Sequence, residues 1–259
     1  MGARNSIDTF LRTCVALVVL PVSLAIYSSV AILRALRGAP AARVHRAYVG
    51  FARSCRRVGG TQLMLRGADR IAAGQSYVVV VNHESAWDPL CVVAALPDLC
   101  LRFVAKGSLM RIPIFGRALA LTGNVRVERT QTAGDVSRIR EGMARRDPAV
   151  SVLFFAEGGR SRDGALRSFR MGAFATALAS GLPVLPIAVA GTYAVWPKGT
   201  LRIARHPVAI EVGEPISTAG LTFEDRAALR DRAHAALTEL RASARRRLRS
   251  SGIEPGGVD

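Results

Sequence analysis

A histidine and an aspartate stand five positions apart, directly after a strongly apolar run of the sequence. The run Tyr77–Val81 is rich in β-branched residues and predicts a buried strand. His83 and Asp88 follow it, and the region beyond the carboxyl end of a strand is where α/β proteins usually carry out chemistry. An imidazole oriented by a carboxylate is a suitable general base near neutral pH. The spacing therefore indicates a catalytic His/Asp pair.

The same two residues also have a purely structural interpretation. Asp88-Pro89 is a typical helix start, with Asp88 as the N-cap and Pro89 as the first helical residue. His83 would then be a loop residue without a chemical role. Residues five apart do not share a helix face, so the pair can meet only if His83 lies in a turn and Asp88 begins the helix. A strand–turn–helix pattern allows both interpretations.

A second polar segment follows another apolar strand, expected at Val150–Phe155. Arg160 can bind an anionic group through its guanidinium fork, and Gly158 and Gly159 would let backbone approach a phosphate closely. Glu157 could orient an arginine or bond to a substrate. The alternatives are a structural salt bridge for Glu157, a plain turn for the glycines and a solvated side chain for Arg160.

The N-terminal region is the most apolar part of the chain. No charged residue occurs between Arg12 and Arg34, and about 20 apolar residues suffice to cross a membrane. Pro21 and three serines interrupt residues 13–33, which predicts either a kinked span or a helical hairpin dipping into one leaflet. A cleaved signal peptide is the competing interpretation, but the apolar region is too long and lacks a good cleavage site.

Arginines gather after this stretch, which by the positive-inside rule places the following domain at the cytoplasmic face of the inner membrane. Between Ala41 and Arg57, arginines alternate with apolar residues at helical spacing. This pattern is typical of a basic amphipathic helix lying on anionic lipid. It is equally typical of an ordinary domain helix with a solvated basic face.

The composition restricts the partners. The formal net charge is +17 over 259 residues, and nearly all the positive charge is arginine because Lys106 and Lys198 are the only lysines. A basic surface beside a membrane suits anionic lipid and phosphorylated co-substrates. Nucleic acid is not expected, since the sequence has no aromatic-interleaved basic platform or recognition-helix signature. The four cysteines and four histidines show neither disulfide nor metal-ligand spacing, so no metal is expected.

Strands that alternate with helices predict an α/β fold with a mostly parallel central sheet flanked by helices. We expect three regions: a membrane helix and a basic amphipathic helix within residues 1–57, an α/β domain over residues 58–249, and a disordered tail over residues 250–259. The strands are expected at 61–65, 77–81, 101–105, 124–127, 150–155, 184–189 and 208–212, and the C-terminal helix at 224–249.

Four segments, in chain order, resemble the glycerolipid acyltransferase family, which includes the 1-acyl-sn-glycerol-3-phosphate acyltransferases. Asn82–Asp88 is similar to the family's His-x4-Asp block, and Gly123–Arg129 to its glycine…arginine block. Phe155–Ser161 is similar to Phe-Pro-Glu-Gly-Thr-Arg-Ser, and Leu182–Ile187 to a proline-containing strand. The resemblance covers roughly residues 61–212.

The resemblance implies transfer of a fatty acyl group from acyl-CoA or acyl-carrier protein, as co-substrate, to the free hydroxyl of a lysophospholipid. The expected acceptor is 1-acylglycerol 3-phosphate, the product phosphatidate, and no further cofactor is expected. His83 would be the base and Asp88 its orienting partner. The candidates for binding the acceptor phosphate are Arg129 and Arg160, with Lys106 third, and Glu157, Gly158 and Gly159 complete the expected substrate-binding set.

The sequence departs from the family pattern at two positions. Ala156 stands in place of a usual proline and Gly159 in place of a usual threonine, whose hydroxyl could contact the acceptor. An acyltransferase for another lysophospholipid or a lyso-aminolipid is therefore an alternative. A lipid-binding membrane protein without catalytic activity is a further alternative from a different class.

Overall fold

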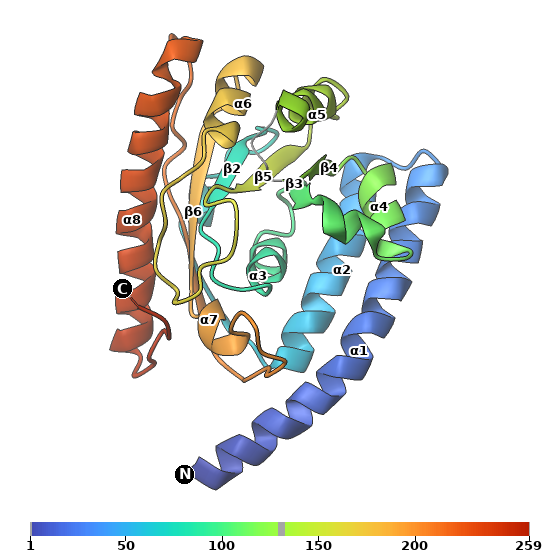
Figure 1. The fold of residues 1–259 in the computed structure, drawn as a ribbon, viewed down its shortest axis with the longest axis vertical. Coiled ribbons are helices and arrows are strands. Elements are labelled where there is room, and N and C mark those ends of the chain that lie inside the picture. Colours follow the sequence, from blue (N-terminus) through green and yellow to red (C-terminus); the bar gives the residue numbers. More distant parts are fainter. Residues whose placement is uncertain (1, 129–132, 259) are drawn as a thin grey trace.

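The computed structural model describes residues 2–128 and 133–258 and shows an α/β fold built on one central sheet (Figure 1). Within these residues the sheet has seven strands in the order β1-β7-β6-β2-β5-β3-β4. Neighbouring strands are parallel except for β6 and β7, which run antiparallel. The predicted mostly parallel sheet is therefore confirmed. The strands are β1 Leu63–Arg66, β2 Val78–Val81, β3 Leu101–Lys106, β4 Val125–Val127, β5 Ser151–Phe155, β6 Val184–Ala190 and β7 Val208–Val212.

Helices cover both faces of the sheet, as Figure 1 shows with α8 on one side and α2 and α3 on the other. The helices are α1 Gly2–Leu36, α2 Ala41–Gly59, α3 Asp88–Ala95, α4 Phe115–Leu121, α5 Ala133–Ala144, α6 Gly172–Ser180, α7 Thr192–Val195 and α8 Arg226–Ser250. Short 3₁₀ turns occur at Ala68–Arg70, Gly107–Arg111 and Phe223–Asp225. The last of these replaces the first turn of the predicted C-terminal helix, which begins at Arg226 as α8.

Strand β2 lies at the centre of the sheet and divides the core into two layers. Val79 and Val81 pack with Trp87 and residues of α2 and α3, whereas Val78 and Val80 face the opposite side, against α6 and α8. All four valines are fully buried. A strand that is covered on both faces needs no polar side, which explains why its sequence is a continuous apolar run. The residues that follow Val81 therefore lie at the carboxyl end of the central strand, in the middle of the sheet.

Helix α1 contains Pro21, and its segment Ile7–Leu36 is long and apolar enough to cross a membrane by length and composition. It packs along α2 and α4 and leaves a row of apolar side chains exposed, among them Phe10, Leu11, Val18, Val22 and Ile26. Helix α2 buries its apolar face in the core while its arginines stay at the surface. Of the two interpretations of α2, the ordinary domain helix accounts for this packing.

The predicted disordered tail is wrong for the described residues. Helix α8 ends at Ser250, and the chain then turns back along the helix, so that the Val258 amide donates to the Asp163 carbonyl at 2.7 Å. Arg245 donates to carbonyls of the same segment, at Gly256 and Gly257. Glycines with positive φ make the reversal possible, and arginines of α8 satisfy its backbone acceptors. Neither feature gives a periodic signal in the sequence.

Candidate active site

The turn between β2 and α3 brings His83 and Asp88 into contact. Nδ1 of His83 lies 2.7 Å from Oδ2 of Asp88. The same oxygen accepts the backbone amides of Glu84 at 2.8 Å and Ser85 at 2.9 Å, and the other oxygen accepts the hydroxyl of Thr192. The carboxylate is fully buried. Four donors therefore hold it in one orientation, which in turn fixes the imidazole.

The predicted role of Asp88 as the N-cap is wrong in detail. The N-cap is Trp87, and Asp88 is the first residue of α3, followed by Pro89. Its carboxylate bonds backward to the turn instead of forward to the helix amides. The structural and chemical interpretations of the pair are thus combined, because the same carboxylate closes the turn and contacts the imidazole.

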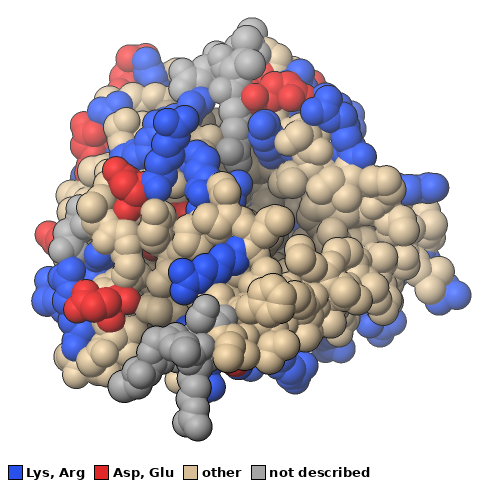
Figure 2. All heavy atoms as spheres, turned by 60° about the horizontal axis from the view of Figure 1, so that its bottom comes forward, with Lys and Arg blue, Asp and Glu red and all other residues tan. Residues whose placement is uncertain are grey.

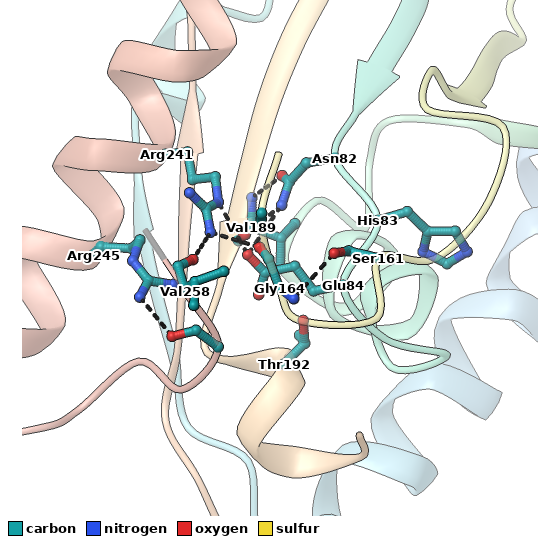
Figure 3. Close-up of polar contacts among 12 residues, drawn as sticks. Asn82, His83, Glu84, Ser161, Gly164, Val189, Thr192, Arg241, Arg245 and Val258 are labelled. Atoms are coloured by element: carbon teal, nitrogen blue, oxygen red, sulfur yellow. Dashed lines mark hydrogen bonds and ion pairs between the residues drawn. The ribbon is translucent and has the colours of Figure 1, made fainter. Parts of the chain in front are cut away.

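The imidazole of His83 lies against the ring of Phe155, with centroids 3.9 Å apart and planes 18° apart. Figure 3 shows it pointing away from the polar cluster of Glu84 and Arg241. With Nδ1–H donated to Asp88, the lone pair of the neutral ring is on Nε2. Nε2 has no hydrogen-bond partner among the residues that the structure describes. This nitrogen is free to accept a proton from a bound molecule.

Glu157 lies directly beyond β5 and supports the turn from the other side. One carboxyl oxygen accepts the backbone amide of His83 at 2.7 Å, and the other accepts that of Arg167 at 3.2 Å. Burial raises the pKa of Glu157 to about 7, against the opposing effect of these two amides. Glu157 thus holds two backbone amides, and its carboxyl oxygens bond to neither the guanidinium nor the backbone of Arg160.

The glycines after Glu157 lie in a loop that packs closely against other parts of the protein. Gly158 has φ +73°, and a Cβ at this position would lie 2.1 Å from Nε of Arg170. The neighbour that requires glycine here is therefore a side chain of the protein itself. Gly159 and Arg160 are half-buried in the same loop, and the Arg160 carbonyl accepts Nζ of Lys198 at 3.0 Å.

One other predicted site residue, Lys106, is not brought to the His83 turn, and a further one lies outside the described residues. Lys106 is exposed at the end of β3, and β5 lies between β3 and β2. Arg129 belongs to residues 129–132 and lies outside the described residues. Among the described residues, no group of three or more His, Cys, Asp or Glu could hold a metal ion.

Sequence reasoning missed several residues that contact the turn. Thr192, from the start of α7, bonds to Asp88, and Arg241, from α8, bonds to Glu84 at 3.2 Å. The Arg160 carbonyl accepts from Lys198, whose pKa is lowered first by desolvation and then by the charges of neighbouring arginines, among them Arg162 and Arg160. A lysine in a chain whose cations are almost all arginine was a signal available in the sequence.

The face toward which β2, β5 and β6 end is hollowed. Figure 2, which brings the bottom of Figure 1 forward, shows a depression with Lys and Arg gathered along one side and uncharged residues along the other. A ligand with an anionic end and an apolar end matches this division of the surface.

An α/β fold with a buried His/Asp pair at the end of its central strand defines the class of protein, and residues 62–190 match the family model described as Acyltransferase. The chain belongs to the acyltransferase family, as its motifs predicted. It is similar to 1-acyl-sn-glycerol-3-phosphate acyltransferase alpha of Homo sapiens, with 32% identity over 186 residues, covering 70% of this chain and 65% of the human protein.

A plant relative and a solved structure extend this comparison. The chain is 30% identical over 166 residues to 1-acyl-sn-glycerol-3-phosphate acyltransferase of Limnanthes douglasii, covering 64% of this chain and 58% of that protein. It thus spans less than two thirds of the length of these curated relatives. Its fold is similar to the crystal structure of the 1-acyl-sn-glycerophosphate acyltransferase PlsC of Thermotoga maritima, with a TM-score of 0.76, 24% identity and coverage of 92% and 98% of the two chains.

Proposed function

We propose that this protein is a membrane-bound acyltransferase that acylates the free hydroxyl of 1-acylglycerol 3-phosphate and so forms phosphatidate. The observation that carries the proposal is the contact of 2.7 Å between His83 and the buried Asp88, which leaves Nε2 free. The names of the relatives in Homo sapiens and Limnanthes douglasii support the choice of acceptor. The fatty acyl donor is a thioester, either acyl-CoA or acyl-carrier protein.

In the proposed reaction, Nε2 of His83 takes the proton of the acceptor hydroxyl while the oxygen of that hydroxyl attacks the carbonyl carbon of the thioester. A carbon–oxygen bond forms and the carbon–sulfur bond breaks. The departing thiolate then receives the proton from the imidazolium, so that the enzyme returns to its starting state. Asp88 keeps the proton on Nδ1 before the reaction and stabilises the imidazolium while it exists.

Direct transfer of the acyl group fits the surroundings of the Ser85 hydroxyl, which lies in the same turn as His83. The Ser85 Oγ donates to the Trp196 carbonyl at 2.8 Å and accepts the Trp87 amide at 3.1 Å. A serine held by two structural hydrogen bonds, with no base beside it, is poorly suited to become a nucleophile. We therefore propose no acyl-enzyme intermediate.

The acceptor phosphate is proposed to bind on the loop that follows β5. Arg160 is half-buried there, and Arg162, Arg167 and Lys198 add positive charge around it. Guanidinium groups bind phosphate oxygens through paired hydrogen bonds. Lys106, at the end of β3 beside β5, remains a proposed contributor, and so does Arg129. We further propose that α1 anchors the enzyme at the cytoplasmic face of the inner membrane.

The test is acyl transfer from radiolabelled long-chain acyl-CoA, or from acyl-carrier protein, to a panel of lysolipids. Wild type, His83→Ala and the control His234→Ala are compared in membranes. We expect labelled phosphatidate from wild type and the control, and none from His83→Ala with its fold intact by circular dichroism. Labelling of another lysophospholipid or of a lyso-aminolipid, in place of lysophosphatidate, would overturn the proposed choice of acceptor. No labelling with either donor would overturn the proposed activity.

A further inference from the structure

Glu84, the residue after His83, points to the opposite side of the turn from the imidazole (Figure 3). Its side chain is almost completely buried. One carboxyl oxygen contacts Nε of Arg241 at 3.2 Å and Nδ2 of Asn82 at 3.4 Å. The other oxygen has no hydrogen-bond partner among the described residues. A buried acid that takes no part in the proposed chemistry requires an explanation, because its desolvation is costly.

The partner of Glu84 is an equally buried arginine from a distant part of the chain. Arg241 lies on α8 and is 6% exposed. Besides Glu84, its guanidinium donates through Nη2 to the carbonyl of Gly164 at 2.6 Å and to that of Val258 at 2.8 Å. One side chain therefore joins the β2–α3 turn, the loop after β5 and the C-terminal tail.

Two chains of hydrogen bonds lead from this guanidinium back to His83. The first passes through Glu84, whose backbone amide donates to the Asp88 oxygen that contacts Nδ1 of His83. The second passes through Gly164, whose amide donates to the Ser161 hydroxyl at 3.0 Å. The Ser161 amide in turn donates to the His83 carbonyl at 2.8 Å.

The C-terminal tail closes on the same loop. The Val258 carbonyl accepts from Arg241, and the Val258 amide donates to the Asp163 carbonyl, next to Gly164. A cation that satisfies acceptors from three segments fixes their relative positions, and such buried polar networks can favour one arrangement over others.

We propose that Arg241 is a positioning residue for the His83/Asp88 pair, and that residues 254–258 form a strap that completes its site. This inference rests on the proposed function for the chemistry that His83 performs. Arg241 does not touch the reacting atoms. It acts by holding the backbone amide of Glu84 and the loop of Ser161 at the distances that orient the imidazole.

A single substitution at Arg241 does not separate positioning from folding. Arg241→Met would leave Glu84 buried without its cation, which strongly destabilises proteins in general. The double variant Glu84→Gln/Arg241→Met removes both charges, so the unpaired carboxylate is gone while the link between α8 and the turn is still broken. The exposed Arg246 on the same helix provides the matched control Arg246→Met.

The experiment measures kcat, KM for both substrates and the melting temperature of the wild type and these variants. We expect the double variant to recover most of the stability that Arg241→Met loses, yet to keep a kcat roughly ten- to a hundredfold below wild type with little change in KM. Arg246→Met should match wild type. A double variant whose kcat returns to wild type together with its stability would overturn the inference, because Arg241 would then be structural only.

A spectroscopic readout makes the result independent of turnover. In the wild type, the Nδ1–H proton of His83, bonded to Asp88, should give a downfield NMR signal that His83→Ala removes. We expect this signal to be lost or shifted in the double variant and kept in Arg246→Met. An unchanged signal in the double variant would overturn the inference even if the wild type transferred no acyl group. Absence of transfer by the wild type would instead contradict the proposed function.

The strap is tested by ending the chain after Ile253, which leaves Arg241 and Glu84 in place. We expect kcat to fall several-fold, less than in the double variant, because Arg241 loses one of its three acceptors. A kcat equal to that of wild type would overturn the role assigned to residues 254–258.

Discussion

Replacing Asp88 by asparagine tests the proposed chemistry most directly, because the change removes a charge and keeps the shape. Oδ2 accepts three hydrogen bonds, from His83 and from the amides of Glu84 and Ser85, whereas Oδ1 accepts one, from Thr192. The amide oxygen of asparagine can take the position of Oδ2. Its NH₂ group would then face the Thr192 hydroxyl, which can turn to accept. The fold should therefore survive.

The charge that is lost stabilises the imidazolium formed when His83 takes a proton. Two unit charges about 4 Å apart interact by about 4 kcal/mol at an effective dielectric constant of about 20. A factor of ten in rate corresponds to about 1.4 kcal/mol, so kcat should fall by about a thousandfold. Asp88 is fully buried, and solvent screening therefore reduces this figure little.

The assay follows release of the thiol from long-chain acyl-CoA at saturating acceptor, beside His83→Ala and the double variant His83→Ala/Asp88→Asn. The double variant should be no slower than His83→Ala, because the carboxylate acts through the imidazole. Asp88→Asn within tenfold of the wild-type kcat, with an unchanged melting temperature, would refute the reasoning. Losses that multiply in the double variant would also refute it.

Three further predictions concern the loop after β5 and the buried Glu84. Arg160→Ala should raise KM for the lysolipid by roughly tenfold or more, because a charge-assisted hydrogen bond to phosphate is worth about 1.5–3 kcal/mol. KM for the thioester should stay unchanged, and equal rises in both KM values would contradict the assigned role of Arg160. Burial, and then the charge of Asp88, raises the pKa of Glu84 to about 8 from 4.5. The stability that this group contributes is therefore lost as the pH rises from 4.5 through 8. Over that window the melting temperature of Glu84→Gln should change less with pH than that of the wild type, and equal slopes for the two proteins would refute this. Gly158→Ala should lower the melting temperature more than Gly181→Ala, because both positions have positive φ but only at Gly158 would a Cβ meet a neighbour; equal losses in thermal melts would count against the contact with Arg170.

The position of the His83/Asp88 pair could be predicted because its determinants are local. A continuous apolar strand, a short turn and a helix that starts at Asp88-Pro89 lie within a dozen residues, and each has its own sequence signal. The same local signals gave the α/β class and the strand order along the chain, and β5 was placed within one residue. The roles of these residues in catalysis stay predictions.

The partners of the pair could not be predicted, because they come from far along the chain. Thr192 contacts Asp88 across 104 positions, and Arg241 contacts Glu84 across 157. Nothing in the spacing of an isolated threonine or of one arginine among many marks such contacts. The C-terminal strap was missed for a related reason, since glycines and a proline after a helix usually indicate a loose end.

Three buried acids lie in or against the turn that carries His83, and each has different partners. Asp88 receives four hydrogen bonds, one of them from Nδ1 of the imidazole. Burial raises the pKa of Glu157 to about 7 and that of Glu84 to about 8, and the charge of Asp88 contributes to both shifts. Burial therefore makes the charged form of each glutamate more costly, and the contacts with Arg241 for Glu84 and with two backbone amides for Glu157 offset part of that cost. Of these three acids only Asp88 contacts Nδ1, so one carboxylate orients the imidazole. The two glutamates act on the backbone of the turn instead: Glu157 accepts the His83 amide, and Glu84 ties the turn to Arg241.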